Sequence, residues 1–468
     1  MGRRAPIVGY IVGYIDMNLG SLLLDHPFDD AENLLHTVDR SVTAGAARQE
    51  ALATAEQLRA AGLTPGQGVA VQMPNGPELI TTLMAVWIAK GLFIPLNPRM
   101  TDAERAGILA TAKPALLVTR SGIQVIPKAA TYDPETAFVM WTSGTSGAPK
   151  AVHHTHSAYF ELLDRVLGPL RGGAAGTKTP SPNLIPVSLA LNAGIYNSLF
   201  GLRAGAALVI MDGFEARQFA ELVRRFQIRS TVLPPAAMAM LSDDPGVSDL
   251  GPLKYVRSIT APLSPLQAKR FAAKFPVTIL NGYGQVEIGE VIGWTAADAR
   301  EHPDKLGAIG KPHPGVAIKL DGDGQLLVRP PNKAVGLEDR VDAEGYVATG
   351  DIARIDEDGF VWIEGRAGDV INRGGNKVFP DAVEEVLRLS PAVDDAAVVG
   401  APDGRLGEIP VAYLLGRPVP DAELIALCRA NLVPFKVPVA FRWVDSFPRS
   451  EVGKILRREL SAREAPRA

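Results

Sequence analysis

The sequence predicts an α/β protein with a large N-terminal domain of parallel-rich sheets, a small antiparallel section, and a small α+β domain at the C-terminal end. Short apolar strands alternate with helix-like segments up to about Lys305, and such alternation is typical of parallel sheets with helices on their faces. Glycine and proline then cluster at Gly307–Gly315, and short strands with alternating side chains follow. Beyond Gly365, helices and strands mix again over a length that suits one small domain.

The first part of the chain contains the clearest local patterns. Val69–Met73 is a short apolar run typical of a buried strand, and Pro77–Lys90 places Leu79, Leu83 and Val86 on one side of a helix. Further strands are predicted at Ala115–Thr119, Ala206–Met211, Arg229–Leu233, Tyr255–Ile259 and Val277–Leu280, with helices at Phe214–Phe226 and Ser264–Phe275. We therefore expect parallel sheets in this part.

The remaining patterns define the antiparallel section and the C-terminal domain. Antiparallel strands are predicted at Gln325–Val328, Tyr346–Ile355 and Phe360–Ile363. The C-terminal domain is predicted to contain helices at Pro380–Leu389 and Ala422–Arg429, strands at Ala396–Val399, Val411–Leu415 and Val439–Val444, and a final basic helix.

Composition excludes several classes of protein. The 468 residues carry a formal net charge of −3, so no bulk basic field points to nucleic acid or to an anionic membrane. Cys428 is the single cysteine, which forbids an internal disulfide and favours a reducing, cytoplasmic compartment. No apolar stretch reaches the roughly 20 residues of a membrane span. The apolar run Ala5–Ile15 follows two arginines, but it lacks a small-residue cleavage site, which favours a segment of the mature fold.

The strongest local signal is Phe138–Lys150, FVMWTSGTSGAPK. An apolar strand runs into a loop whose glycines let backbone N–H groups turn toward an anion. Lys150 adds a point charge for a terminal phosphate. The other residues expected to contact phosphate are Thr142, Ser143, Gly144, Thr145, Ser146 and Gly147. The spacing differs from that of a Walker-type loop, in which lysine directly follows the second glycine.

This loop resembles the phosphate-binding signature of the acyl-adenylate-forming superfamily, which includes acyl-CoA synthetases, adenylation domains of peptide synthetases and luciferases. The resemblance recurs in order along the chain and covers about Gln49 to Leu460. Five further segments are similar to motifs of the superfamily: Asn281–Glu287 (NGYGQVE), Gly307–Pro312 (GAIGKP), Tyr346–Asp351 (YVATGD), Gly365–Asp369 (GRAGD) and Pro448–Lys454 (PRSEVGK). Six motifs in order make a chance match untenable.

The resemblance implies a role for each matching residue. Glu287 is expected to hold Mg²⁺ together with the phosphates of ATP, because a hard cation prefers carboxylate and phosphate oxygens. Asp351 is expected to accept hydrogen bonds from both ribose hydroxyls, with Arg366 close to the same ribose and phosphate. Tyr283 is expected to stack on adenine, and Thr260–Leu263 resembles the segment along the other adenine face.

The C-terminal motifs imply a reaction in two halves. Lys454 is expected to bridge the carboxylate and the α-phosphate during adenylation, which offsets the repulsion between two anions. Gly368 corresponds to the hinge about which the small domain rotates before the thiol attacks. Gly375 falls where the superfamily leaves room for the pantetheine arm of coenzyme A. The expected division is therefore 1–365 for the large domain, 366–369 for the hinge and 370–468 for the small mobile domain carrying the lysine.

Three features depart from the superfamily or invite another interpretation. Val286 replaces the threonine that precedes the Mg²⁺-binding glutamate and so removes a hydroxyl from the α-phosphate. The segment Leu184–Gly194 lacks the aspartate that holds an amino group, so an aliphatic or aromatic acid is expected rather than an α-amino acid. His153, His154 and His156 cluster, but Thr155-His156 also matches the superfamily's helix start, which disfavours a metal site.

The expected function is ATP-dependent activation of a carboxylic acid and transfer of the acyl group to coenzyme A, with ATP, Mg²⁺ and coenzyme A as cofactors. One alternative is loading of a carrier-protein thiol, although no carrier domain follows in the sequence. Another is a catalytically weakened nucleotide- or acyl-binding protein, motivated by Val286 and the altered segment Leu184–Gly194. The sequence leaves the particular acid and the oligomeric state open.

Overall fold

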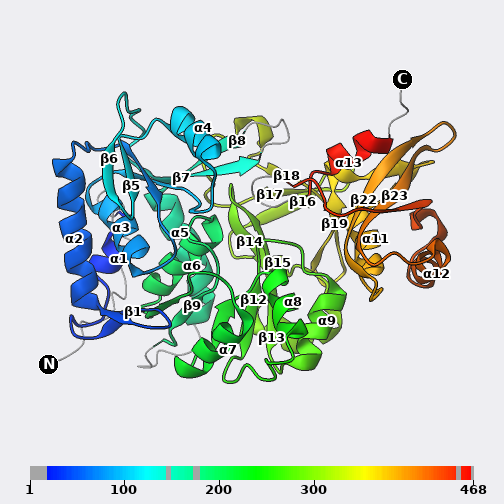
Figure 1. The fold of residues 1–468 in the computed structure, drawn as a ribbon, viewed down its shortest axis with the longest axis horizontal. Helices are drawn as coiled ribbons and strands as arrows, with labels where there is room; N and C mark the ends of the chain where they lie inside the picture. The colour runs from blue at the N-terminus through cyan, green and yellow to red at the C-terminus, as the bar shows by residue number, and fades with distance from the viewer. Residues whose placement is uncertain (1–17, 144–148, 172–179, 450–454, 465–468) are drawn as a thin grey trace. The chain divides into compact units, whose positions relative to one another are not determined.

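The computed structural model describes residues 18–143, 149–171, 180–449 and 455–464. Contacts divide the chain into two compact units, Met1–Val316 with Pro330–Asp339, and Ala317–Arg329 with Arg340–Ala468. Figure 1 traces the chain through both of them. The predicted boundary at residues 366–369 stays a prediction, because the contacts group the antiparallel section with the C-terminal part.

The first unit contains two mixed sheets. Within the described residues, the larger one has nine strands in the order β15 (Lys311–Pro312), β14 (Gly289–Gly293), β13 (Thr278–Gln285), β12 (Tyr255–Ser258), β11 (Ser230–Val232), β9 (Asn183–Ile185), β10 (Leu208–Ile210), β1 (Asn33–His36) and β2 (Ser41–Thr43). Its pairs are parallel from β13 to β1, and only its two ends are antiparallel.

The smaller sheet of the first unit follows the same plan. Its six strands lie in the order β6 (Gly122–Val125), β5 (Leu116–Thr119), β3 (Gly68–Gln72), β4 (Leu92–Pro95), β7 (Thr136–Ser143) and β8 (Pro149–Thr155) within the described residues. The four central strands are parallel and both edge pairs are antiparallel. The antiparallel edge of β7 and β8 carries the predicted phosphate loop.

Helices cover the faces of both sheets (Figure 1). They are α1 (Ser21–Leu24), α2 (Ala44–Ala60), α3 (Pro77–Ile88), α4 (Asp102–Ala112), α5 (His156–Arg171), α6 (Asn192–Arg203), α7 (Ala216–Arg225), α8 (Pro235–Asp243), α9 (Pro265–Lys274) and α10 (Ala296–Glu301). Local chemistry sets several of their starts: Pro77 occupies the first turn of α3, and Thr101 and Glu104 form a reciprocal capping box at α4.

One hydrophobic core joins residues of both sheets in the first unit. Trp87 of α3, Phe138 of β7 and Phe160 of α5 are almost completely buried within it. The indole nitrogen of Trp87 donates to the carbonyl of Ala137 at 2.7 Å, so this buried polar group is satisfied. A second core packs α7, α8 and α9 against the larger sheet. Packing in these cores fixes the ends of the strands that carry the candidate site residues.

The described residues of the second unit also form two sheets. The strands β16 (Ala317–Leu320), β17 (Gln325–Arg329), β18 (Val347–Ile355) and β19 (Val361–Arg366) form an antiparallel meander. The other sheet contains β21 (Asn376–Val378), β20 (Ile371–Arg373), β23 (Gly407–Gly416), β22 (Val393–Asp403) and β24 (Ala440–Trp443). Helices α11 (Pro380–Leu387), α12 (Asp421–Asn431) and α13 (Arg457–Glu464) complete this unit.

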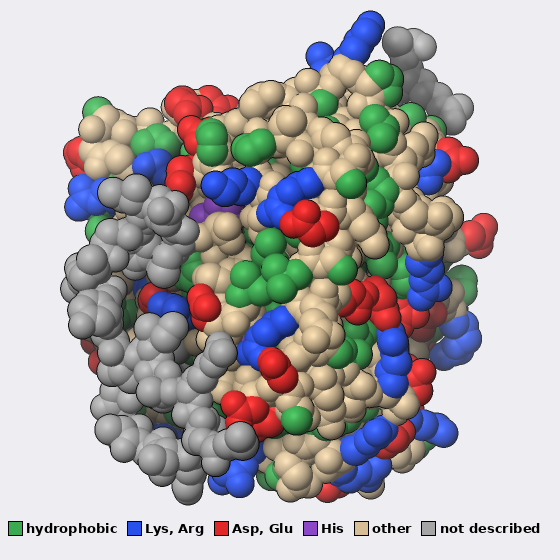
Figure 2. Space-filling model, turned by 90° about the vertical axis from the view of Figure 1, so that its left-hand side faces the viewer, with side chains coloured by type: hydrophobic (Ala, Val, Ile, Leu, Met, Phe, Trp, Pro, Cys, Tyr) green, Lys and Arg blue, Asp and Glu red, His purple; other side chains and the backbone are tan. Residues whose placement is uncertain are grey.

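The predicted fold class is confirmed. The strand predicted at Val69–Met73 is β3, the helix predicted at Pro77–Lys90 is α3, and the section after Gly315 is antiparallel. The apolar run Ala5–Ile15 lies outside the described residues. Among the helices of the described part, none combines the length and apolar character that crossing a bilayer requires. On the face drawn in Figure 2, basic and acidic side chains are interspersed, in keeping with the small net charge of −3.

Candidate active site

The strands β7 and β8 form the base of the predicted phosphate loop. Their antiparallel ladder pairs Thr142 with Lys150 and Ser143 with Pro149, so the two strands meet where the loop begins. For these residues the backbone pairing is described and the side chains are not. Four of the expected phosphate contacts lie outside the described residues: Gly144, Thr145, Ser146 and Gly147.

Tyr283 and Glu287 lie close together on a strand and the turn that follows it. Tyr283 is on β13, where its hydroxyl accepts a hydrogen bond from Gln285 Nε2 at 3.3 Å. Glu287 is in the turn between β13 and β14, and its carbonyl accepts a hydrogen bond from the Ala334 amide at 2.8 Å. Both side chains are half-buried, so each retains access to solvent or to a ligand.

Val286, the residue before Glu287, has apolar surroundings. Its side chain is partly buried and packs against the large hydrophobic core. The turn ends at Gly289, whose φ is +66° and where a Cβ atom would lie 2.7 Å from Leu162 of α5. The positive φ therefore favours glycine at this position, and a side chain there would also displace Leu162.

The residues around Glu287 fit a cation that is shared with phosphates. Within the described residues, no three side chains of the metal-binding types gather into a site that the protein alone could complete. Mg²⁺ commonly uses one or two protein carboxylates and takes its remaining ligands from phosphates and water. The single half-buried carboxylate of Glu287 matches that donor set.

Asp351 and Arg366 form the clearest contact among the predicted site residues. They are opposite each other in the antiparallel ladder of β18 and β19. Arg366 Nε lies 2.8 Å from Asp351 Oδ1, with the Asp351 side chain 5% exposed and that of Arg366 53% exposed. The arginine thus covers the carboxylate from the solvent side.

The irregular stretch of β18 before Asp351 is fixed by two polar side chains. Gly350 has a φ of +76°, and its amide donates to Gln325 Oε1 at 2.9 Å. Thr349 Oγ1 donates to the carbonyl of Leu326 at 2.7 Å and accepts from the Asp351 amide at 3.1 Å. These bonds explain the local sequence YVATGD: glycine permits the positive φ within the strand, and threonine and Gln325 hold the backbone that bears the carboxylate.

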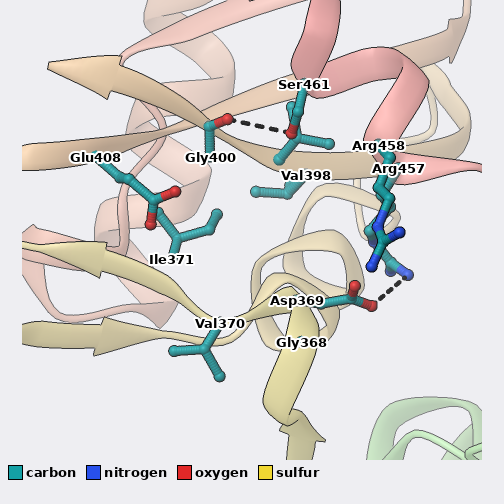
Figure 3. A pocket seen from close by; sticks show the side chains of 11 residues that line it. Gly368, Asp369, Val370, Ile371, Val398, Gly400, Glu408, Arg457, Arg458 and Ser461 are labelled. Atoms are coloured by element: carbon teal, nitrogen blue, oxygen red, sulfur yellow. Dashed lines mark hydrogen bonds and ion pairs between the residues drawn. The ribbon is translucent and has the colours of Figure 1, made fainter. Parts of the chain in front are cut away.

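The predicted hinge residue lies beside an ion-pair network of the second unit. Gly368 follows β19, and a Cβ atom there would have no heavy atom within 4 Å. Arg457 of α13 reaches Asp369 at 3.4 Å, and it also pairs with Asp381 and Glu384, both at 2.8 Å. Figure 3 shows Arg457 and Asp369 facing each other at a cavity of about 200 Å³.

The expected catalytic lysine, Lys454, lies outside the described residues. The chain on either side of it is fixed: Arg449 and Ile455 form an antiparallel bridge, and the Leu456 amide donates to the carbonyl of Pro448 at 2.8 Å. Arg449 also pairs with Asp395 at 3.1 Å. Arg449 and Ile455 are therefore neighbours in the second unit.

Gly375 occupies the tight turn between β20 and β21. Its φ is +84° and that of Gly374 is +56°, both in the left-handed region. A Cβ atom at Gly375 would have no heavy atom within 4 Å. Backbone conformation alone therefore favours glycine here, apart from any role in a thiol channel.

The three clustered histidines are packing residues. His154 stacks on Phe138 with ring centroids 4.5 Å apart, and burial lowers its pKa to about 3. His156 accepts a hydrogen bond from the Leu19 amide at 3.1 Å, and burial lowers its pKa to about 4. His153 is half-buried with its ring 5.6 Å from that of Tyr132.

The sequence did not reveal a buried charge cluster close to Glu287. Arg257 Nη2 of β12 lies 2.9 Å from Glu290 Oε1 of β14, and His313 Nε2 lies 3.1 Å from the same oxygen. Arg257 and His313 hold the pKa of Glu290 below its ordinary value, although burial acts more strongly than either in the opposite direction. No spacing within one motif signals this cluster, because each residue comes from a different segment.

Comparison with protein families accounts for most of the chain. The AMP-binding enzyme family matches residues 26–135 and 124–336, and the AMP-binding enzyme C-terminal domain matches residues 382–454. The chain belongs to the AMP-binding enzyme family. The predicted superfamily is thereby confirmed, and with it the prediction that the chain is an enzyme.

Several curated proteins resemble this AMP-binding enzyme over nearly its whole length. The fatty acid–[acyl-carrier-protein] ligase ScoC of Streptomyces coeruleorubidus is 29% identical, with 91% of this chain and 92% of ScoC covered. The 2-succinylbenzoate–CoA ligase of Bacillus licheniformis is 28% identical, with 88% and 92% covered.

Solved structures share the fold of this AMP-binding enzyme. The amide bond synthetase McbA from Marinactinospora thermotolerans has a TM-score of 0.80 at 25% identity, covering 95% of this chain and 98% of that one. MenE, the o-succinylbenzoate CoA synthetase from Bacillus subtilis in complex with its acyl-adenylate intermediate, has a TM-score of 0.81 at 24% identity, covering 94% and 97%.

Proposed function

We propose that this AMP-binding enzyme is an AMP-forming acid–CoA ligase. A carboxylic acid attacks the α-phosphate of ATP, which releases pyrophosphate and forms an acyl-adenylate. The thiol of coenzyme A then attacks the acyl carbon, and AMP leaves. The observation that supports the proposal is the ion pair of Asp351 and Arg366 at the expected ribose position, in a chain that matches both the AMP-binding family and its C-terminal domain.

The proposed roles follow from residue chemistry. Asp351 accepts from the ribose hydroxyls, because a carboxylate offers two acceptor oxygens. Glu287 holds Mg²⁺, which would neutralise phosphate charge when bound. Lys454 acts in adenylation, by stabilising charge that develops on the phosphoryl oxygens. The remaining proposed contacts are Lys150 and the loop Thr142–Gly147 for phosphate, Tyr283 for adenine, Gly375 for the thiol arm and Gly368 for the hinge.

A second candidate differs only in the thiol that accepts the acyl group. The relative ScoC is named as a ligase for an acyl carrier protein, and its 29% identity is similar to that of the CoA ligases. Transfer to a carrier-protein thiol is therefore the alternative that a specific observation favours. It uses the same first half-reaction.

The test separates the two half-reactions. Carboxylate-dependent exchange between ATP and pyrophosphate is measured across a panel of aliphatic, alicyclic and aromatic acids, and reports adenylation alone. The best acid is then incubated with ATP and either coenzyme A or a purified phosphopantetheinylated carrier protein, with mass detection of the thioester.

We expect exchange with one class of acid and formation of its acyl-CoA. Thioester on the carrier protein, without any acyl-CoA, would favour the alternative. Absence of exchange with every acid, in folded protein that binds ATP, would contradict both and leave a nucleotide-binding protein weakened in catalysis.

A further inference from the structure

Asn75 connects the two sheets of the first unit at the ends of their strands. It follows β3 of the smaller sheet, and its side-chain nitrogen donates to the carbonyls of Val187 at 3.0 Å and of Met211 at 2.9 Å. Its side-chain oxygen accepts a hydrogen bond from the Leu189 amide at 2.9 Å. Val187 and Leu189 follow β9, and Met211 follows β10, both in the larger sheet. One half-buried side chain thus holds backbone 112 to 136 residues further along the chain.

These contacts require an asparagine. They use both N–H donors and the acceptor oxygen of its side-chain amide at once. An aspartate of the same size has no donor for the two carbonyls, and an apolar side chain has neither donor nor acceptor. The backbone that leaves β9 therefore depends on this one side chain for three of its fixed points.

The segment after β9 is also held at its other end. The Tyr159 hydroxyl of α5 donates to Asn192 Oδ1 at 3.0 Å, at the residue where α6 begins. A Cβ atom at Gly194 would lie 2.1 Å from the carbonyl oxygen of Ser188, so the first turn of α6 packs directly on the segment. Between these anchors the Leu191 side chain is 46% exposed. The segment is therefore fixed at both ends and presents a leucine in between.

The segment lies at the same edge of the larger sheet as Glu287. Strands β9 to β13 are parallel, so their carboxyl ends share one edge. Glu287 is in the turn after β13, and Pro186–Leu191 follows β9. Because β11 and β12 lie between those two strands, the segment is to one side of Glu287. Ligands of parallel sheets bind beyond the carboxyl ends of the strands, which makes this segment a neighbour of the proposed chemistry.

The composition of the segment suits the hydrocarbon part of an acid. Pro186–Gly194 (PVSLALNAG) contains no charged residue, and Ser188 and Asn192 are its polar ones. Both make local hydrogen bonds: the Ser188 hydroxyl accepts from the Ala190 amide at 3.2 Å, and Asn192 accepts from Tyr159. What remains for a ligand is apolar, as is usual for the walls of a small-molecule site.

We propose that Asn75 is a positioning residue for the acid: it fixes Val187–Leu191 so that Leu191 contacts the hydrocarbon part of the substrate. This inference rests on the proposed function, since it assigns residues that recognise the acid activated there. Asn75 acts through the backbone that it holds and takes no part in the chemistry. Without its hydrogen bonds the segment samples several arrangements, which weakens recognition of the acid and leaves the nucleotide contacts as they are.

The test separates recognition of the acid from recognition of the nucleotide. Pyrophosphate exchange is measured with the full chain across saturated monocarboxylic acids of increasing length and a matching series of benzoic acids, and ATP affinity is measured by calorimetric titration. We expect Asn75→Ala to raise KM for the best acid by ~10-fold or more. The kcat/KM ratio between the best acid and the acid one methylene shorter should fall by ~10-fold. The dissociation constant of ATP should stay at the parent value.

Two further variants assign the effect to the segment. Asn75→Asp keeps the size of the side chain and the acceptor for the Leu189 amide, but it loses both donors and places a carboxylate against two carbonyls. It should be at least as impaired as Asn75→Ala. Leu191→Ala shortens an exposed side chain, so it should fold normally, and it should shift the preferred length of the acid, with kcat/KM ratios changing by ~10-fold.

The matched control is Asn183→Ala. Asn183 stands at the amino end of the same strand, β9, where its side-chain nitrogen donates to the Asn197 carbonyl at 2.7 Å. This variant also loses a hydrogen bond between a side chain and distant backbone, but at the opposite end of the strand. It should lower thermal stability and leave both KM for the acid and the ranking of acids unchanged.

A purely structural role for Asn75 predicts a different pattern. In that case Asn75→Ala would behave like the control, with lower stability, an unchanged KM for the acid and an unchanged ranking, which overturns the inference. An equal rise in the dissociation constant of ATP would overturn it too. Should both Asn75 variants fail to fold, Leu191→Ala decides, because an unchanged ranking there overturns the inference. Absence of exchange with any acid in the parent protein would instead contradict the proposed function, so the two failures are distinguishable.

Discussion

Arg366 Nε lies 2.8 Å from Asp351 Oδ1, across the ladder of two adjacent antiparallel strands. The carboxylate is buried and the guanidinium is half-exposed. We propose that this pair binds the ribose of ATP. We expect Asp351→Asn to raise the dissociation constant of ATP by ~10- to 100-fold, because a charged acceptor is lost. Calorimetric titration with ATP measures this, and Asp342→Asn, at an exposed pair with Lys319, is the control. Unchanged affinity would contradict the ribose assignment.

Lys454→Ala is expected to lower pyrophosphate exchange by ~10²-fold or more, because the charge building on the phosphoryl oxygens loses its lysine. Thioester formation from supplied acyl-adenylate and coenzyme A should remain largely intact. The matched control is Lys436→Ala, at a lysine of the same unit outside the motif. Equal loss in both half-reactions would argue against a role confined to adenylation.

Substitutions that add a side chain at Gly375 are expected to leave adenylation unchanged and to impair transfer of the acyl group to coenzyme A. The structure adds a complication, since the φ of +84° strains any L-residue. We therefore compare Gly375→Leu with Gly375→Asn, because asparagine tolerates the left-handed region better. Both variants should raise KM for coenzyme A while exchange stays near the parent value. Normal coenzyme A kinetics in a folded Gly375→Asn protein would eliminate the channel assignment.

Val286→Thr is expected to raise the exchange rate by ~10-fold, because it introduces a hydroxyl next to Glu287 that can donate to the α-phosphate. The Val286 side chain packs partly against the core, so the hydroxyl should also lower the melting temperature slightly. Val286→Ala loses the packing without gaining a donor and should lower stability with no gain in rate. A threonine variant no faster than the parent would show that the valine does not limit activation.

Acid should destabilise the first unit through His156. Burial lowers the pKa of this histidine from 6.5 to about 4, and its neutral ring accepts a hydrogen bond from the Leu19 amide. A folded-state pKa below the unfolded one means that stability is complete above pH 6.5 and is lost as the pH falls towards 4. The loss at pH 5 amounts to ~2 kcal/mol.

The variant His156→Asn isolates this effect, because the asparagine oxygen replaces the accepting ring nitrogen but does not titrate. The free energy of unfolding is measured by urea denaturation at pH 8 and pH 5 for both proteins. The decrease between the two pH values should be smaller in the variant. Parallel decreases would exclude His156 as a source of the acid sensitivity.

Much of the fold could be predicted from local sequence. Apolar runs such as Val69–Met73 become central parallel strands because both of their faces are buried. Strands near the end of the sheet were harder to predict: β14, next to the edge strand β15, has two glycines and a buried glutamate, Glu290, in its five residues. Such a strand depends on partners distant in the sequence rather than on its own pattern.

Some residues of the candidate site could likewise be predicted from local sequence, and others could not. Asp351 and Arg366 each stand in a short motif, so their partnership across β18 and β19 could be anticipated. Arg257, Glu290 and His313 could not, because each occupies an otherwise ordinary segment. Their contacts arise from the order of the strands in the larger sheet, which no single segment of sequence encodes.

The contact between Arg257 and Glu290 has a consequence for how this enzyme can diverge. Strand β13 runs between their strands, and a Cβ atom at Gly282 would lie 2.9 Å from Glu290 Oε1. The Arg257–Glu290 pair is therefore packed against backbone that leads directly to Glu287. A substitution at either member should shift this backbone, so the pair can diverge only together with the turn between β13 and β14.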